Sequence, residues 1–372
     1  MKIMKAKSRK EMARGNMKPN AHIAALAGRS GKSIMRRILP ALAIGIFAVQ
    51  ALSAQDGDQD QGRHRGRDPD LWFSSGDDLE VKGMVAHPDF MRLFDTPSQW
   101  PTGLTHIDVM QLRAQWFLRM PPETGQKVTD FLKEHDIALS VPLGFVSSDT
   151  CGQGVEGIGT ARGQNVYPRE MKKRGIDLKY VVMDEPLFHA HDYNGPNACH
   201  FSIEQVVDSV ATNVQMVRSY YPDVKFVWVE PPQSLLGGAQ EMAQFLDLYK
   251  ARLGEYPVSV RFDIAWGQQD KWHTEWHAVL PSFLQVLKAR GIHYGIIFDA
   301  GHVEGRVPNT DAGWIASAKA NVADWMATIH EKPNQIIIQT WSPNPVHIVP
   351  ETDLITMTGY LKWFINQEHF PR

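Results

Sequence analysis

Acidic side chains stand at the ends of several apolar runs in this sequence. The segment 180–188, YVVMDEPLF, passes from apolar residues directly to Asp184 and Glu185. Later runs end in the same way, on Glu230, Asp263 and Asp299. A carboxyl at the end of a buried strand is partly desolvated, which raises its pKa toward neutral pH while it still reaches a substrate. We therefore predict that Glu185 is a general acid, with Asp184, Asp299 or Glu230 as its catalytic partner.

Each of these carboxyls also has a structural alternative. Glu185 could cap the helix that follows it or pair with an arginine. Asp184, Asp299 and Glu230 could satisfy backbone donors in their own loops. The sequence leaves both interpretations open.

Aromatic residues gather near the same positions. The C–H faces of sugar rings stack on tryptophan, and the chain has 11 tryptophans. Those at or just beyond the ends of apolar runs are Trp266, Trp272 and Trp341, which we predict to be sugar platforms, with core packing as the alternative. Polar candidates for substrate contacts are Glu156, His189, Asp263 and His302.

Two other motifs are judged against their context. Gly152, Gly154 and Gly157 have the G-x-G-x-x-G spacing of dinucleotide-binding turns, but no strand leads into them and no helix follows directly. His189, His191 and Asp192 contain ligand types for a metal, but their spacing matches no helical ligand pair and the sequence shows no third ligand cluster. We expect neither a cofactor nor a metal.

Eight short apolar runs supply the elements that would position these residues. They are segments 89–94, 106–112, 137–146, 180–186, 224–231, 258–266, 293–301 and 335–341. Most are nearly continuous in apolarity, as expected of parallel strands that are buried on both faces. Stretches with helical spacing lie between them, at 124–136, 201–223, 278–291 and 312–333. The pattern predicts a single (β/α)8 barrel over 71–372, with an open doubly wound sheet as the alternative.

The chain begins with a segment that we exclude from the fold. From Met35, two arginines, an apolar run and then small residues follow in the order of a secretory signal, so residues 1–54 are predicted to be a leader, with Met35 a possible true start. Residues 55–70 lack an apolar pattern and are predicted to be a flexible linker. We expect export to the periplasm or the medium, without stable membrane insertion after cleavage.

Charge and cysteine content constrain the partners further. Without the leader the chain has 28 basic and 40 acidic residues, a balance that disfavours nucleic acid and favours neutral or amino-sugar ligands. Cys151 and Cys199 are an even pair in a chain that we expect to be exported, which predicts a disulfide, with two free thiols as the alternative. The sequence gives no indication of the oligomeric state.

The fourth run, which closes on Glu185-Pro186, resembles the acid/base strand of retaining barrel glycosidases. That family carries Asn-Glu-Pro, whereas this sequence has Asp184, and its seventh-strand nucleophile is a Glu, whereas this sequence has Asp299. The Asp184-Glu185 pair also resembles that of barrel hexosaminidases, which implies that Asp184 orients a substrate acetamido group and Glu185 protonates the leaving oxygen.

These observations predict a glycoside hydrolase, with a retaining mechanism favoured, that acts on an oligo- or polysaccharide. A non-catalytic glycan-binding barrel and an exopolysaccharide lyase or transglycosylase are the alternatives.

Overall fold

The computed structural model describes residues 69–80, 86–267, 275–301, 306 and 308–367. These belong to one compact unit, Asp60–Arg372. The predicted leader and residues 55–68 of the predicted linker lie outside the described residues. None of the described helices is both long and apolar enough to cross a membrane.

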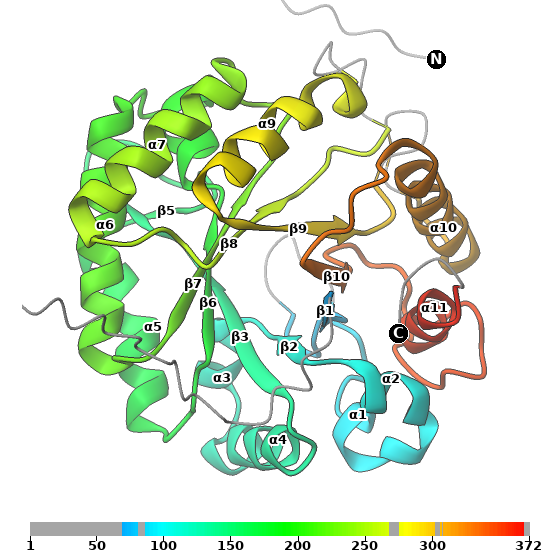
Figure 1. Ribbon diagram of the computed structural model, residues 1–372. Helices are drawn as coiled ribbons and strands as arrows, with labels where there is room; N and C mark the ends of the chain where they lie inside the picture. Colours follow the sequence, from blue (N-terminus) through cyan, green and yellow to red (C-terminus); the bar gives the residue numbers. More distant parts are fainter. Residues whose placement is uncertain (1–68, 81–85, 268–274, 302–305, 307, 368–372) are drawn as a thin grey trace, which may run out of the picture. The chain divides into compact units, whose positions relative to one another are not determined.

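Eight parallel strands close into a barrel (Figure 1). In chain order they are β1 (Asp70–Ser74), β2 (Val109–Gln111), β3 (Ala138–Leu143), β6 (Tyr180–Asp184), β7 (Lys225–Glu230), β8 (Ser259–Phe262), β9 (His293–Phe298) and β10 (Gln335–Gln339). The ring closes because β1 pairs with both β2 and β10. The predicted (β/α)8 barrel is therefore confirmed.

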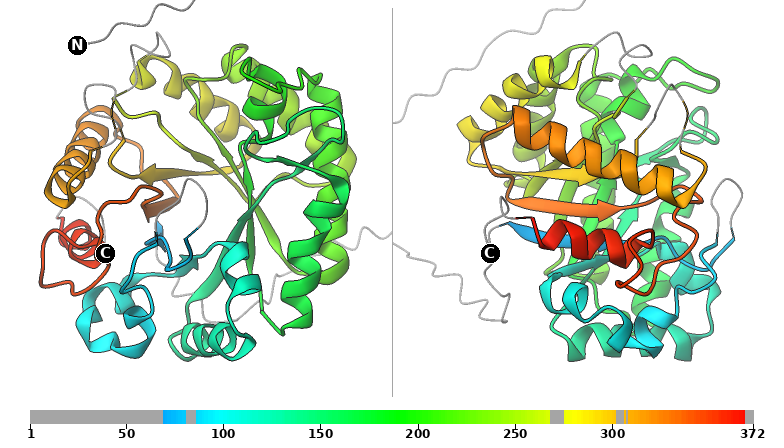
Figure 2. Two further views of the ribbon diagram at one scale, coloured as in Figure 1. Left: turned by 180° about the vertical axis from the view of Figure 1, so that it is seen from behind. Right: turned by 90° about the vertical axis from the view of Figure 1, so that its right-hand side faces the viewer.

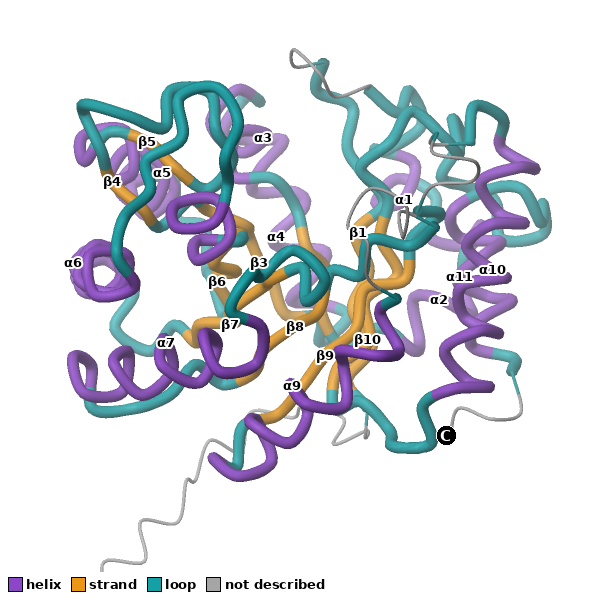
Figure 3. The backbone as a smooth tube through the Cα atoms, turned by 90° about the horizontal axis from the view of Figure 1, so that it is seen from above, coloured by secondary structure: helices purple, strands orange, loops and turns teal. Residues whose placement is uncertain are grey.

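Helices surround the barrel, as the views in Figures 2 and 3 show. They are α1 (Arg92–Asp95), η1 (Pro97–Gln99), α2 (Pro101–His106), α3 (Ala114–Arg119), α4 (Pro122–Glu134), α5 (Ala161–Lys173), the π-helical turn η2 (Phe188–Asp192), α6 (Ile203–Tyr220), α7 (Gly238–Leu253), α9 (Trp276–Arg290), α10 (Asp311–Thr328) and α11 (Met357–Ile365). Two short strands, β4 (Val146–Ser147) and β5 (Ile158–Gly159), pair with each other outside the barrel.

The first predicted strand is wrong. Segment 89–94 leads into helix α1, and its buried residues Phe90, Leu93 and Phe94 have the i, i+3, i+4 spacing of one helix face. The true first strand is Asp70–Ser74, which begins on the last residue assigned to the linker and aligns with all five residues of β10. A five-residue strand directly after a polar stretch gives only a weak periodic signal.

The strands alternate between two apolar layers, and this alternation orients the site. One buried cluster fills the inside of the barrel, with Val182, Val227, Val229 and Ile297 among its members. The flanking residues, such as Met183 and Trp228, belong to the cluster that packs on the helices. Because side chains alternate along a strand, the parity of a strand-end residue decides whether it faces the barrel axis or the helices.

A disulfide joins two loops at the ends of neighbouring barrel strands. Cys151 lies between β4 and β5, and its partner Cys199 lies between η2 and α6. The backbone reinforces the link, because Gly152 N donates to the carbonyl of Asn197 at 2.7 Å. The predicted disulfide is therefore present in the structure.

Candidate active site

Three aspartates end barrel strands with inward parity. Val182 and Ile297 belong to the inner layer of the barrel, and Arg261 is fully buried. Two residues after each of them, and therefore on the same face of the strand, comes one of the aspartates, Asp184, Asp299 and Asp263 respectively. The three side chains therefore face the barrel axis just beyond the inner apolar layer, at the C-terminal ends of β6, β8 and β9. This is the end of a TIM-type barrel at which active sites lie.

The backbone turns sharply after β6. Glu185 has a φ of +42°, a conformation that costs free energy for a residue with a Cβ and that is concentrated at functional sites. Its side chain is 15% exposed. The loop before β5 presses on this turn, since a Cβ added at Gly157 would lie 2.5 Å from the carbonyl oxygen of Asp184. Gly157 therefore allows close backbone approach, which accounts for one glycine of the G-x-G-x-x-G spacing without a dinucleotide.

A histidine links two glutamates beside this turn. His189 Nε2 is 3.0 Å from Glu185 Oε2 and 3.6 Å from Glu156 Oε2. Glu156 belongs to the loop between β4 and β5. Burial alone would lower the pKa of His189, but its contacts with Glu156 and Glu185 outweigh burial and raise the pKa to about 10. His189 is consequently a cation at neutral pH, and it lowers the pKa of the exposed Glu156.

Burial raises the pKa values of the carboxyls at the rim, whereas its effect on His189 is to lower the pKa. It raises the pKa of Glu185, and it raises those of Asp184 and Asp263 well above their usual range. Repulsion among the carboxyls adds to this shift, since Glu156 and Glu185 act on Asp184, and Asp299 and Glu185 act on Asp263. The carboxyls therefore share one electrostatic environment.

Asp299 accepts two hydrogen bonds from the protein. Gly301 N donates to Oδ1 at 2.9 Å and Trp341 Nε1 donates to Oδ2 at 2.8 Å. Burial raises the pKa of Asp299 to about 6, and these donors limit the rise because they favour the ionised form. Trp341 itself is 49% exposed, so part of its ring is open to a ligand beside this carboxylate.

Glu230 lies on the other face of its strand. Its parity is that of Trp228, and its carboxylate accepts bonds from Trp228 Nε1 at 2.8 Å, Leu187 N at 2.7 Å and Phe188 N at 3.1 Å. The residue is 1% exposed. It ties the first turn after Glu185 to the neighbouring strand, which is a positioning role.

Comparison with known proteins yields only distant likenesses. No protein-family model matches the chain, and no curated protein matches it. Among solved structures, xylanase10C from Cellvibrio japonicus is similar at a TM-score of 0.46 and 12% identity, over 74% of this chain and 63% of that one. A psychrophilic family 10 endo-β-1,4-xylanase gives 0.45 and 8%, over 79% and 90%. D-psicose 3-epimerase from Clostridium cellulolyticum H10 gives 0.42 and 11%, over 80% and 96%. These likenesses concern the barrel alone, so any function must follow from the site residues.

Two of the predicted aromatic platforms differ in their surroundings. Trp266 is 2% exposed, its ring packs on Phe298 and Trp276, and its Nε1 donates to the carbonyl of Ile297. It is a core residue with no ring face left for a sugar. Trp341 remains the candidate. Trp272 and His302 lie outside the described residues.

The sequence reasoning missed Arg261 beneath the aspartates. This fully buried guanidinium stacks 4.2 Å from the ring centre of Trp72 and donates to Gln111 Oε1 at 3.0 Å. Burial lowers its pKa to about 9, so it is still a cation at neutral pH, and its charge favours ionised Asp184. The period of two along β8 could have revealed it, since Arg261 precedes Asp263 by two residues on the same face.

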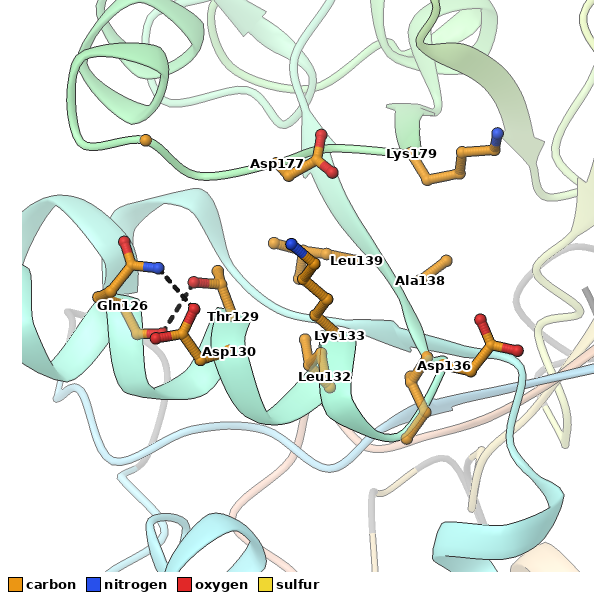
Figure 4. Close-up of a pocket in the computed structure, with 12 residues that line it drawn as sticks. Gln126, Thr129, Asp130, Leu132, Lys133, Asp136, Ala138, Leu139, Asp177 and Lys179 are labelled. Atoms are coloured by element: carbon orange, nitrogen blue, oxygen red, sulfur yellow. Dashed lines mark hydrogen bonds between the residues drawn. The ribbon is translucent and has the colours of Figure 1, made fainter. Parts of the chain in front are cut away.

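A pocket at the opposite end of the barrel has a different character (Figure 4). It is lined by the start of β3, by the segment just before β6 and by helix α4, and its charged residues include Asp130, Lys133, Asp136 and Lys179. Because it opens at the N-terminal ends of the strands, we do not include it in the candidate active site.

Proposed function

We propose that the protein is an exported glycoside hydrolase in which Glu185 is the acid/base and Asp299 is its anionic partner. One observation carries this proposal, namely that two carboxyls at one rim have contrasting surroundings. Glu185 is on a strained turn, where burial raises its pKa although the neighbouring His189 opposes the rise, whereas Asp299 accepts two N–H bonds that favour its ionised form. Environments that separate two carboxyls in this way are typical of acid/base sites.

In the proposed reaction Glu185 protonates the glycosidic oxygen while the bond from that oxygen to the anomeric carbon breaks. The bond electrons leave with the oxygen, and Asp299 meets the positive charge that develops on the carbon. In the retaining version, which we favour, an Asp299 oxygen bonds to this carbon. A water molecule then displaces Asp299 and gives its proton to Glu185, so that both residues return to their starting state.

Glu230 is not proposed as the nucleophile. Its oxygens already accept three bonds from the protein, and its parity places it toward the helices. A carboxylate held in this way would have to give up those donors before it could reach a substrate.

A second version of the mechanism has support from Asp184. This half-buried aspartate precedes Glu185 and has inward parity, and burial raises its pKa well above the usual range. In this position it could hold the acetamido group of an amino sugar, whose oxygen would replace Asp299 as the nucleophile. Substrates with and without a 2-acetamido group distinguish the two versions, because the second requires that group.

The substrate that we propose is a neutral or amino-sugar glycan. Trp341 offers an exposed ring beside Asp299. Export to the periplasm or the medium is supported by the disulfide, because such bonds persist in oxidising compartments.

Leaving-group dependence tests the two roles separately. An aryl glycoside with a good leaving group, such as dinitrophenol, needs little protonation, whereas a methylumbelliferyl or natural glycoside needs more. We expect Glu185→Gln to lose about 10²–10⁴-fold in kcat/KM on the poor leaving group and much less on the good one. We expect Asp299→Asn to lose activity on both.

The matched control for the first variant is Glu134→Gln, an exposed glutamate on α4. Equal turnover by wild type and Glu185→Gln would contradict the assignment of Glu185. Binding of glycans without turnover, on polysaccharides as well as aryl glycosides, would support the glycan-binding alternative instead.

A further inference from the structure

A second cluster of ionisable side chains lies next to the turn that carries His189. His191 and Asp192 belong to η2, and Glu241 belongs to the first turn of α7. One possible ligand atom from each residue lies within 4.8 Å of the other two. The Glu241 side chain is 5% exposed and that of His191 is 32% exposed, so the cluster is accessible from solvent at the imidazole.

We propose that His191, Asp192 and Glu241 bind a divalent transition-metal ion such as Zn²⁺. One imidazole nitrogen with two carboxylate oxygens is a ligand set that Zn²⁺ accepts, with a fourth position left for water. Ligand atoms around a tetrahedral zinc are roughly 3.4 Å apart, given bonds of roughly 2.0–2.2 Å. His191 Nε2 and Glu241 Oε1 are 3.0 Å apart, which is already close to that spacing. The Asp192 side chain would have to move toward these two atoms to complete the site.

The surroundings orient each ligand toward the cluster. His191 Nδ1 lies 2.5 Å from the carbonyl of Phe201, and a proton donated there leaves Nε2 as the nitrogen that faces Glu241. Such a bond fixes the tautomer of a metal-binding imidazole. Leu236 N donates to Asp192 Oδ2 at 3.0 Å, and Gly237 N donates to Glu241 Oε2 at 2.7 Å. These backbone donors hold one oxygen of each carboxyl and leave the other for an ion.

The charge of the cluster also favours a cation. The carboxyls of Asp192 and Glu241 each bring one oxygen within 4.8 Å of the other and of the imidazole. A cation between two carboxylates offsets their mutual repulsion. A bound ion would connect η2 to α7, and η2 is the turn that holds His189 against Glu185. The inference stands whether or not the proposed hydrolase activity is correct.

The experiment measures Zn²⁺ binding to chelator-treated protein by calorimetry, together with the melting temperature with and without Zn²⁺. We expect saturable binding of one ion at this cluster and a higher Tm in its presence. Loss of an outer-shell partner of a metal typically costs about 10–100-fold in affinity. Glu241→Gln and His191→Gln each remove a direct ligand, so each should raise the dissociation constant by at least that factor and should abolish the rise in Tm.

The matched control is His277→Gln. This histidine also lies between two carboxylates, but at 3.9 Å from both Glu275 and Asp324. The His277→Gln variant should bind Zn²⁺ with the same affinity as the wild type. Glutamine at 241 keeps an acceptor for Gly237 N, so an unchanged Tm without metal would show that the variant is folded. Absence of saturable binding to wild type, or binding that survives in both cluster variants, would overturn the proposal.

Discussion

The two ends of the barrel carry charge in different ways. At the N-terminal end, the pocket of Figure 4 has exposed aspartates mixed with lysines, an arrangement that costs little in water. At the C-terminal end, Asp184, Asp263 and Asp299 are buried or half-buried, and burial raises their pKa values. Acids whose pKa values are raised by burial and by one another cost stability, so their clustering at the C-terminal end is the pattern expected of a functional site.

Neutralising one acid at each end tests directly whether the two ends differ in function. We expect Asp299→Asn to reduce kcat/KM by about 10²–10⁴-fold, because the proposed anionic partner of Glu185 would be lost. Asp177→Asn, at the exposed N-terminal end, should leave kcat/KM unchanged. Steady-state kinetics on an aryl glycoside measures both, and comparable losses in the two variants would remove the distinction between the ends.

Stability separates a positioning acid from an exposed one. Glu230→Ala leaves three buried donors without their acceptor, so we expect it to lower the free energy of unfolding by about 3 kcal/mol. Asp130→Ala on α4 should change it by less than about 0.5 kcal/mol. Urea denaturation gives both values. A mild effect at Glu230 would show that its bonds to the turn after Glu185 are dispensable.

The smallest effect concerns the pH dependence of the site. Asp299 has to be ionised in the proposed reaction, so kcat/KM should rise with pH through a limb near pH 6. Trp341→Phe removes an N–H donor that favours the ionised carboxylate, so the pKa should increase and the limb should move to higher pH by up to about one unit.

Trp363→Phe on α11 is the control for the pH experiment and should leave the limb in place. A shift of the Trp341→Phe limb to lower pH would contradict the role assigned to the indole N–H. A limb that does not move would assign the acidic titration to another carboxyl.

Much of the fold was predictable because buried parallel strands are short and continuously apolar. Seven of the eight barrel strands coincide with predicted runs, and β1 was missed because DLWFS directly follows a polar stretch. The strand-end acids were identified, but their orientation was not. A count of two from Trp228 would have placed Glu230 toward the helices, whereas the same count from Val182 places Asp184 inside.

Contacts between distant loops were beyond the sequence. Glu156 meets His189 only because the loop before β5 folds over the turn after β6, and no local pattern encodes that approach. The same holds for Glu241, which joins His191 and Asp192 from a helix 49 residues further along the chain. Trp266 looked like Trp341 in sequence, and only burial distinguishes the two.

The close approach at Gly157 sets limits on how this protein can diversify. Any side chain at that position would collide with the backbone of Asp184, so mutation there would be felt at the strand end that carries Glu185. The exposed Gln153, in the same loop, has no such constraint. Evolution, or an engineer seeking a new specificity, can therefore vary the residues around Gln153 while Gly157 stays fixed against β6.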